Sequence, residues 1–164
     1  MGERPVRFRV GTGYDLHRLT PGRALILGGV AIPCEVGLEG HSDADALAHA
    51  VTDALLGAAA LGNIGRLFPD TDPRYKDADS MVFVQEAARL VRDAGYRVAN
   101  IDSTIVAQQP KLGPYLDAMC ERMAECAGLE TGCVSVKAKT NEGVGPEGRC
   151  EAIRVHAVVL IEEV

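Results

Sequence analysis

Residues 6–10 alternate between hydrophobic and polar side chains, the period of a half-buried β-strand. Val6, Phe8 and Val10 occupy one face of this strand, and two arginines separate them. The segment Gly11-Thr12-Gly13 follows, and we interpret it as a glycine-bearing turn that ends the strand. Polar residues that come next are therefore expected just past a strand end.

Four later runs of the chain are rich in aliphatic and β-branched residues and predict further strands. The first covers residues 24–32 and is closed by Pro33. The other three runs comprise residues 96–106, 134–138 and 153–161. The last has the clearest alternation, and because His156 alternates within it, we interpret this histidine as a structural residue.

Three segments have the longer apolar period of helices. The first is predicted to begin with Ser42 as N-cap and Asp45 as the capping-box acid, and to run to about Gly62. A second is predicted from residue 79 or 80 to 95, and a third from Pro114 to Gly128. The order of strands and helices lacks strict alternation, which predicts an α+β fold with a mixed sheet packed on one side by about three helices.

The length of 164 residues and the hydrophobic content of 47% predict one compact domain over residues 1–164. Aromatic residues make up 4% and tryptophan is absent, so the core is expected to consist of Ala, Val, Leu and Ile. The formal net charge of -6 argues against nucleic acid or an anionic membrane as a partner. A polyanionic small molecule would need metal ions or a few placed basic residues.

Five cysteines form no C-x-x-C pair, so the sequence predicts neither a disulfide framework nor a zinc ribbon. The N-terminus has no pattern of a signal or transit peptide, and no apolar stretch is long enough to span a bilayer. Together these features predict a bacterial, or already mature, protein of the reducing cytoplasm.

Asp15 and His17 stand two residues apart, so in an extended segment their side chains point the same way. His49 lies on the polar face of the first predicted helix, with Ser42, Asp45 and Asp53. Two imidazoles and a carboxylate suit zinc, and three protein ligands leave a fourth position open, as in catalytic sites. The alternative is a solvated helix face whose histidines only satisfy hydrogen bonds.

His41 and Ser42 stand at the start of the same predicted helix, which favours a bound phosphate or an ordinary N-cap. The long loops at residues 63–78 and 139–150 are candidates for function. Lys111 and Arg149 are either phosphate clamps or surface charges. Dinucleotide, P-loop and nucleophile-elbow motifs are absent from the sequence.

With these segments placed in order, the chain resembles the 2-C-methyl-D-erythritol 2,4-cyclodiphosphate synthase family, the cyclising enzymes of non-mevalonate isoprenoid biosynthesis. The resemblance covers nearly the whole chain, in the family's order and spacing. It is carried by the segments GTGYDLHRL, HSDADALAHAVTDALLGAAALGNIGRLFPDTDP, ADS, AQQPKL, KAKTNE and GPEGRCEAI.

The resemblance implies a phosphorus–oxygen lyase that converts 4-diphosphocytidyl-2-C-methyl-D-erythritol 2-phosphate to the cyclic diphosphate and CMP. It assigns one zinc ion per subunit to Asp15, His17 and His49, and Mg²⁺ or Mn²⁺ to Glu142 and phosphate oxygens. It also implies a cytoplasmic homotrimer whose active sites lie between subunits, with the zinc region on one subunit and the cytidine pocket on the next.

By the same resemblance, His41 and Thr140 stabilise the pentacoordinate phosphorus, and residues 107–111 form the cytosine pocket. Substrate contacts are implied for Asp15, His17, His41, Ser42, Asn63, Ile64, Gly65, Phe68, Pro69, Asp70, Thr71, Asp72, Ala107, Gln108, Gln109, Pro110, Lys111, Lys139, Thr140, Asn141, Glu142 and Arg149.

Four residues depart from the family's usual pattern. Asn63 stands where many members have Asp, so a sugar hydroxyl would meet an amide. Lys139 and Asn141 flank Thr140 where threonines are usual, and Pro146 replaces a common phenylalanine beside an apolar cavity on the trimer axis. Two rival functions share the same three metal ligands: a zinc phosphohydrolase that activates water, and a non-catalytic protein in which zinc only ties the strand to the helix.

Overall fold

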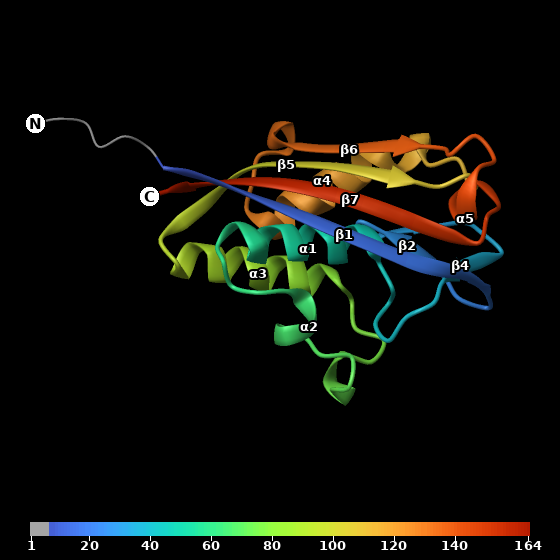
Figure 1. Cartoon of the computed structure of the whole chain (residues 1–164), viewed down its shortest axis with the longest axis horizontal. Coiled ribbons are helices and arrows are strands. Elements are labelled where there is room, and N and C mark those ends of the chain that lie inside the picture. The colour runs from blue at the N-terminus through green and yellow to red at the C-terminus, as the bar shows by residue number, and fades with distance from the viewer. Residues whose placement is uncertain (1–6) are drawn as a thin grey trace, which may run out of the picture.

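A five-stranded sheet with three helices on one face forms the framework of the chain in a computed structural model that describes residues 7–164 (Figure 1). Val6 and the N-terminus lie outside these residues. The predictions of the first strand and of the absence of a leader peptide rest partly on them. The strands are β1 (Phe8–Pro21), β2 (Leu25–Leu27), β3 (Val30–Ile32), β4 (Val36–Leu38), β5 (Tyr96–Val106), β6 (Val134–Lys139) and β7 (Ala152–Glu163). The helices are α1 (Ala46–Ala58), α2 (Ile64–Leu67), α3 (Met81–Asp93), α4 (Leu116–Ala127) and α5 (Gly145–Gly148), with 3-10 turns η1 (Pro73–Tyr75), η2 (Gly113–Tyr115) and η3 (Thr131–Cys133).

The strand order of the main sheet is β4-β1-β7-β5-β6. The β5 and β6 pair is parallel, and the other neighbours are antiparallel, so the predicted mixed sheet and α+β class are confirmed. The core between sheet and helices is rich in Ala, Val, Leu and Ile, with Met81, Met119 and Met123 also buried. Within residues 7–164, no helix combines the length and the apolar character needed to cross a membrane.

The prediction of a turn at Gly11-Thr12-Gly13 is wrong, because these residues lie inside β1. The two glycines serve close packing instead. A Cβ atom at Gly11 would lie 1.9 Å from the carbonyl oxygen of Ala54, and one at Gly13 would lie 1.8 Å from that of Ala50. Helix α1 therefore rests directly on the backbone of β1, and Asp15 lies within the strand rather than past its end.

Helix α1 begins at Ala46, with Asp45 rather than Ser42 as its N-cap, and ends at Ala58, short of the predicted Gly62. The Asp45 carboxylate accepts a hydrogen bond from the N–H of Ala48 at 3.0 Å, which makes this residue the N-cap. It also accepts the N–H groups of Gly28 and Gly29 at 2.9 and 2.7 Å. Asp45 is thus fully buried rather than part of a solvated helix face.

The single extended run predicted at residues 24–32 is in fact a hairpin of β2 and β3. Gly28 and Gly29 form its turn with φ of 59° and 71°, a conformation that glycine adopts without steric cost. The two predicted loops also contain short helices: α2 and η1 lie within residues 63–78, and α5 lies within residues 139–150.

The sheet face opposite the helices carries a row of exposed apolar side chains. Phe8 and Val10, predicted on the buried face of the first strand, are 57% and 62% exposed. Tyr14, Leu16 and Val158 are exposed on the same face. His156 is also exposed there, 5.2 Å from the ring of Tyr14, so its interpretation as a structural residue has no support from burial.

Candidate active site

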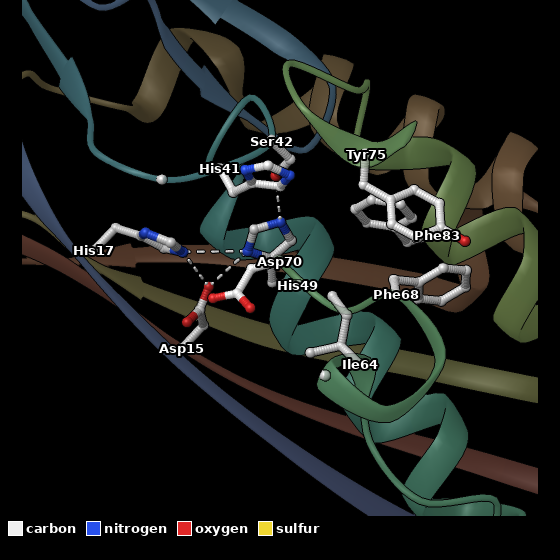
Figure 2. Close-up of a pocket in the computed structure, with 12 residues that line it drawn as sticks. Asp15, His17, His41, Ser42, His49, Ile64, Phe68, Asp70, Tyr75 and Phe83 are labelled. Carbon is white, nitrogen blue, oxygen red and sulfur yellow. Dashed lines mark hydrogen bonds and ion pairs between the residues drawn. The ribbon is translucent and has the colours of Figure 1, made fainter. Parts of the chain in front are cut away.

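Asp15, His17 and His49 meet at one point between β1 and α1 (Figure 2). Asp15 Oδ2 lies 2.9 Å from His17 Nε2 and 3.0 Å from His49 Nδ1, and the two nitrogens are 3.2 Å apart. Ligands of a tetrahedral zinc ion are separated by about 3.3 Å. Among residues 7–164, these three side chains form a group that one metal ion could share.

The packing of α1 on the two strand glycines explains this convergence. Gly13, Asp15 and His17 are alternate residues of β1, so their side-chain positions face the helix layer. The close approach of α1 at Gly13 and Ala50 brings the adjacent His49 within reach of Asp15. His17 Nδ1 lies 2.6 Å from the carbonyl oxygen of Glu39 and donates to it, which leaves His17 Nε2 free to bind a metal.

The cluster favours a cation. Burial acts to raise the pKa of Asp15, but hydrogen bonds and charge from His17 and His49 outweigh it and lower the pKa to about 2. Burial acts to lower the pKa of His17, but the hydrogen bond and charge of Asp15 raise it overall. Without a metal, the two imidazoles therefore compensate the carboxylate, and a metal ion would take their place as the counter-charge.

In the metal-free chain, this ion pairing is expected to give stability that depends on pH. The part due to Asp15 is present above its ordinary pKa of 3.8 and is lost as pH falls toward 2. The part due to His17 is present below its ordinary pKa of 6.5 and is lost as pH rises through the raised value. With a chelator present, the melting temperature of wild type should exceed that of Asp15→Asn most between pH 3.8 and pH 6.5. A difference in melting temperature that grows from about pH 7 to about pH 9 would contradict the ion pairing of Asp15 with His17.

A cavity of about 380 Å³ opens beside the metal cluster (Figure 2). This volume is within the range of small-molecule sites. Its lining includes four of the predicted substrate residues of the loop after α1. The lining residues are Asp15, His17, Gly40, His41, Ser42, His49, Ile64, Gly65, Phe68, Asp70, Tyr75 and Phe83.

His41 and Ser42 line this cavity, but for a different reason from the one predicted. The amino end of α1 lies at Asp45, whose own carboxylate accepts a hydrogen bond from the first turn. His41 and Ser42 instead reach the cavity from the segment before the helix. His41 Nε2 donates to the carbonyl oxygen of Asp72 at 3.1 Å, and Ser42 Oγ lies 3.1 Å from His49 Nε2.

An aromatic cluster forms the far wall of the cavity, and of its three rings only Phe68 was predicted as a site residue. The rings of Phe68 and Phe83 stack with centroids 4.6 Å apart, and Tyr75 meets both edge-on. The only sequence signal for Phe83 was its place in an apolar helical pattern, which indicated a core residue. Its ring also lies 6.3 Å from that of His49, so the wall and the metal cluster are close neighbours.

The other predicted residues of the loop after α1 support its backbone. Asn63 caps α2 through the N–H of Arg66 at 3.1 Å, and Asp72 binds the guanidinium of Arg74 at 2.6 Å. Asp53 accepts the N–H of Ile64 at 2.7 Å and so ties this loop to α1. Burial raises the pKa of Asp53. The predicted substrate residues of this loop that do not line the cavity are Asn63, Pro69, Thr71 and Asp72.

Part of the predicted cytosine pocket and diphosphate site lies in a second cavity, of about 350 Å³. It is formed where β5 and β6 end and η2 begins. The predicted residues outside its lining are Gln108, Gln109, Asn141, Glu142 and Arg149. The lining residues are Ala107, Pro110, Lys111, Leu112, Gly113, Pro114, Leu116, Ala138, Lys139 and Thr140.

Side chains of the loop after β6 bind one another near this second cavity. Thr140 Oγ1 donates to Glu142 Oε1 at 3.0 Å, and Gln108 accepts the N–H of Gly143 at 3.2 Å. Asn141 donates to the buried Glu147 at 3.0 Å. Arg149 forms an ion pair with Glu151 at 2.8 Å on the surface.

Within one chain the two cavities are separate. Asp15 pairs with Val155, which pairs with Ile105, which pairs with Ala138. Three strand spacings amount to about 14 Å. Glu142 and Thr140 therefore do not reach the metal cluster of their own chain.

Comparisons with known proteins agree with this geometry. The YgbB family model matches residues 8–162. A 2-C-methyl-D-erythritol 2,4-cyclodiphosphate synthase from Chromobacterium violaceum is 60% identical over 156 residues, which cover 95% of this chain and 99% of that protein.

Solved structures give the same result. A 2C-methyl-D-erythritol-2,4-cyclodiphosphate synthase in a CDP-bound form has a TM-score of 0.85 and 43% identity, over 93% of this chain and 99% of that one. The bifunctional IspDF of Campylobacter jejuni has a TM-score of 0.93 and 42% identity, over 97% of this chain and 43% of that one. With the family model matching nearly all of the described residues, the chain belongs to the YgbB family, together with the cyclodiphosphate synthases that it resembles in sequence and structure.

Proposed function

We propose that this chain is a 2-C-methyl-D-erythritol 2,4-cyclodiphosphate synthase of non-mevalonate isoprenoid biosynthesis. Its substrate would be 4-diphosphocytidyl-2-C-methyl-D-erythritol 2-phosphate, and its products the cyclic diphosphate and CMP. The observation that carries the proposal is the three-ligand cluster of Asp15, His17 and His49 at the wall of a cavity that His41 and Ser42 also line. The relatives with this name match the chain over nearly its full length.

The donor set fits zinc, because one carboxylate oxygen and two imidazole nitrogens lie at the mutual distances that a tetrahedral ion requires. Asp15, His17 and His49 would hold it, and Glu142 would hold Mg²⁺ or Mn²⁺. These ions would supply charge neutralisation and a fixed position for phosphate oxygens. The polyanionic substrate would otherwise be repelled by a chain of net charge -6.

The attacking 2-phosphate is ionised at neutral pH, so the chain needs to align the reacting groups rather than supply a strong base. The 2-phosphate oxygen attacks the β-phosphorus, and the bond to the CMP oxygen breaks. His41 would donate to the phosphate beside the metal cluster once its Nε2–H leaves the carbonyl oxygen of Asp72. Thr140 would do so from the second cavity once its hydroxyl leaves Glu142. The apolar wall around Phe68 would limit the access of water to the reacting phosphates.

The two cavities are proposed to complete one site between neighbouring copies of a homotrimer. They lie about 14 Å apart in one chain, whereas the substrate must contact both at once. The exposed apolar row of Phe8, Val10, Tyr14, Leu16 and Val158 supports the assembly, because a second copy would remove it from water.

The assembly makes a specific prediction for Val10, which is 62% exposed in a single chain. Val10→Glu should barely affect an isolated subunit, because surface substitutions usually change stability by less than about 0.5 kcal/mol. In the trimer it would bury a charge, so light scattering should show dissociation, with loss of activity. Val82→Glu, at a 51% exposed position on α3, is the control and should remain trimeric. A trimeric and active Val10→Glu variant would refute the proposed interface.

Phosphorus NMR of the purified protein with the cytidyl substrate, zinc and Mg²⁺ tests the activity itself. The expected result is CMP together with two coupled resonances of a cyclic diphosphate. Running the reaction in ¹⁸O-labelled water separates the cyclase from the rival zinc phosphohydrolase. A cyclase incorporates no label, whereas linear products that carry the label would overturn the assignment.

A further inference from the structure

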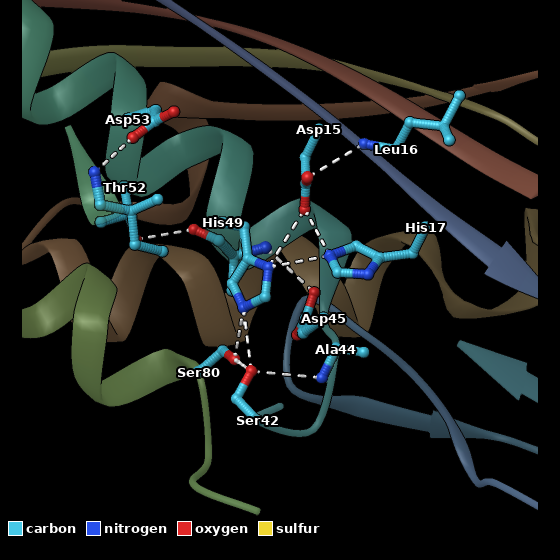
Figure 3. Close-up of polar contacts among 12 residues, drawn as sticks. Asp15, Leu16, His17, Ser42, Ala44, Asp45, His49, Thr52, Asp53 and Ser80 are labelled. Atoms are coloured by element: carbon cyan, nitrogen blue, oxygen red, sulfur yellow. Dashed lines mark hydrogen bonds and ion pairs between the residues drawn. The ribbon is translucent and has the colours of Figure 1, made fainter. Parts of the chain in front are cut away.

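Ser80 lies beside His49 of the metal cluster (Figure 3). It connects this histidine to Asp43, a half-buried carboxylate that no predicted role includes. This serine precedes α3, has no exposed surface, and places its Oγ 2.9 Å from His49 Nε2. The same hydroxyl donates to Asp43 Oδ1, and Asp43 Oδ2 accepts the N–H of Ser80 at 3.1 Å. His49 thus has Asp15 on Nδ1 and two hydroxyl groups on Nε2, that of Ser80 at 2.9 Å and that of Ser42 at 3.1 Å.

The pair of Ser80 and Asp43 favours a proton on Nε2 of His49, the ring nitrogen that points away from Asp15. A carboxylate only accepts hydrogen bonds, so the Ser80 hydroxyl proton must point to Asp43. The Ser80 oxygen is then left as an acceptor for the N–H at Nε2 of His49. When a metal binds beside Asp15 and His17, the lone pair of Nδ1 would go to the ion while the N–H at Nε2 would stay on Ser80.

We propose that Ser80 and Asp43 are positioning residues for the metal ligand His49. The proposal rests on the proposed metal centre and names the residues that fix the tautomer and ring direction of one ligand. His17 has a comparable support, because its Nδ1 donates to the carbonyl oxygen of Glu39. Such partners of ligating histidines raise metal affinity by holding the ring in its binding orientation.

The support for Ser80 is itself anchored at several points. The N–H of Asp43 donates to the carbonyl oxygen of Ala78 at 3.1 Å, and the N–H of Asp77 donates to that of His41 at 2.9 Å. These bonds join the segment before α1 to the segment before α3. Ser80 therefore stands on a backbone frame that does not depend on its own hydroxyl, and removing that hydroxyl should affect His49 more than the fold.

Zinc affinity of wild type and Ser80→Ala, measured by competition with a chelating dye, tests the proposal. Ser80→Ala should bind zinc about 10- to 100-fold more weakly. Ser103→Ala is the matched control, because Ser103 is 2% exposed and its hydroxyl donates to the carbonyl oxygen of Ser135, away from the cluster. The control should keep wild-type affinity. Equal affinity in Ser80→Ala, or an equal loss in both variants, would overturn the positioning role.

A second measurement keeps the test valid if Ser80→Ala does not fold. In zinc-loaded wild type, a nitrogen–proton correlation spectrum should show a slowly exchanging proton on His49 Nε2. A rapidly exchanging proton there would overturn the hydrogen bond to Ser80. Wild type that binds no zinc would overturn the metal centre as well, whereas zinc binding without a protected proton would overturn the positioning pair alone.

Discussion

A variant with His49 replaced by alanine is expected to lose cyclase activity while it keeps its fold. The substitution removes one of three ligands from the metal cluster, and we expect activity to fall by at least about 1,000-fold. In the metal-free protein the substitution removes the hydrogen bonds of the ring with Asp15, Ser42 and Ser80. These are worth about 1–2 kcal/mol, which for a chain of this size lowers the melting temperature by only a few degrees, on the order of 5 °C.

This contrast separates the enzyme from the rival protein in which zinc only ties the strand to the helix. Thr52→Ala is the matched control, because Thr52 is buried on the same helix and its hydroxyl donates to the carbonyl oxygen of Ala48 at 2.7 Å. Activity and zinc content are measured for both variants, and melting is followed in the presence of a chelator. If His49→Ala remained active, the metal cluster would have no part in the reaction.

The metal cluster could be predicted from sequence because its geometry depends on short-range rules. Asp15 and His17 share one side of an extended segment wherever that segment lies, so the error about the end of the strand did not affect the inference. His49 followed from the polar face of one helix. Only the distance between β1 and α1 depends on contacts between distant parts of the chain, and Gly11 and Gly13 of β1 determine it.

The start of α1 could not be read from sequence, because two capping residues stand three positions apart and tertiary contacts decide between them. Asp45 receives N–H groups from the β2–β3 hairpin as well as from its own helix. Ser42 instead turns its hydroxyl toward His49 and Ser80. A local pattern contains no information about the hairpin that arrives from 16 residues earlier in the chain.

Glycines gave the wrong local signal for the same reason. Gly-x-Gly after an alternating segment is typical of a turn, yet both glycines of β1 have ordinary strand conformations and serve the approach of α1. Phe83, Tyr75 and Ser80 were likewise missed, since each has an unremarkable role in its own segment. Their importance arises only where the α3 segment meets the metal cluster.

Gly13→Ala is expected to destabilise the chain more strongly than the loss of the His49 side chain. The new Cβ would lie 1.8 Å from the carbonyl oxygen and 2.7 Å from the carbonyl carbon of Ala50. Both are backbone atoms of α1, so no side chain can move aside and the helix itself must shift. Overpacking of a core costs about 1–3 kcal/mol when side chains can adjust, and we expect about 4 kcal/mol or more at this position.

The same shift would move His49, the neighbour of Ala50, away from Asp15, so any folded fraction of Gly13→Ala should also bind zinc poorly. Gly57→Ala is the control on the same helix, because the nearest atom to its new Cβ is the carbonyl oxygen of Thr12 at 3.9 Å. There the loss of backbone freedom in the unfolded chain should make alanine neutral or stabilising by about 0.5–1 kcal/mol. Urea unfolding and zinc titration of the two variants measure both effects. A Gly13→Ala protein with wild-type stability and zinc affinity would show that α1 does not rest on the β1 backbone, and the metal cluster would then need another explanation.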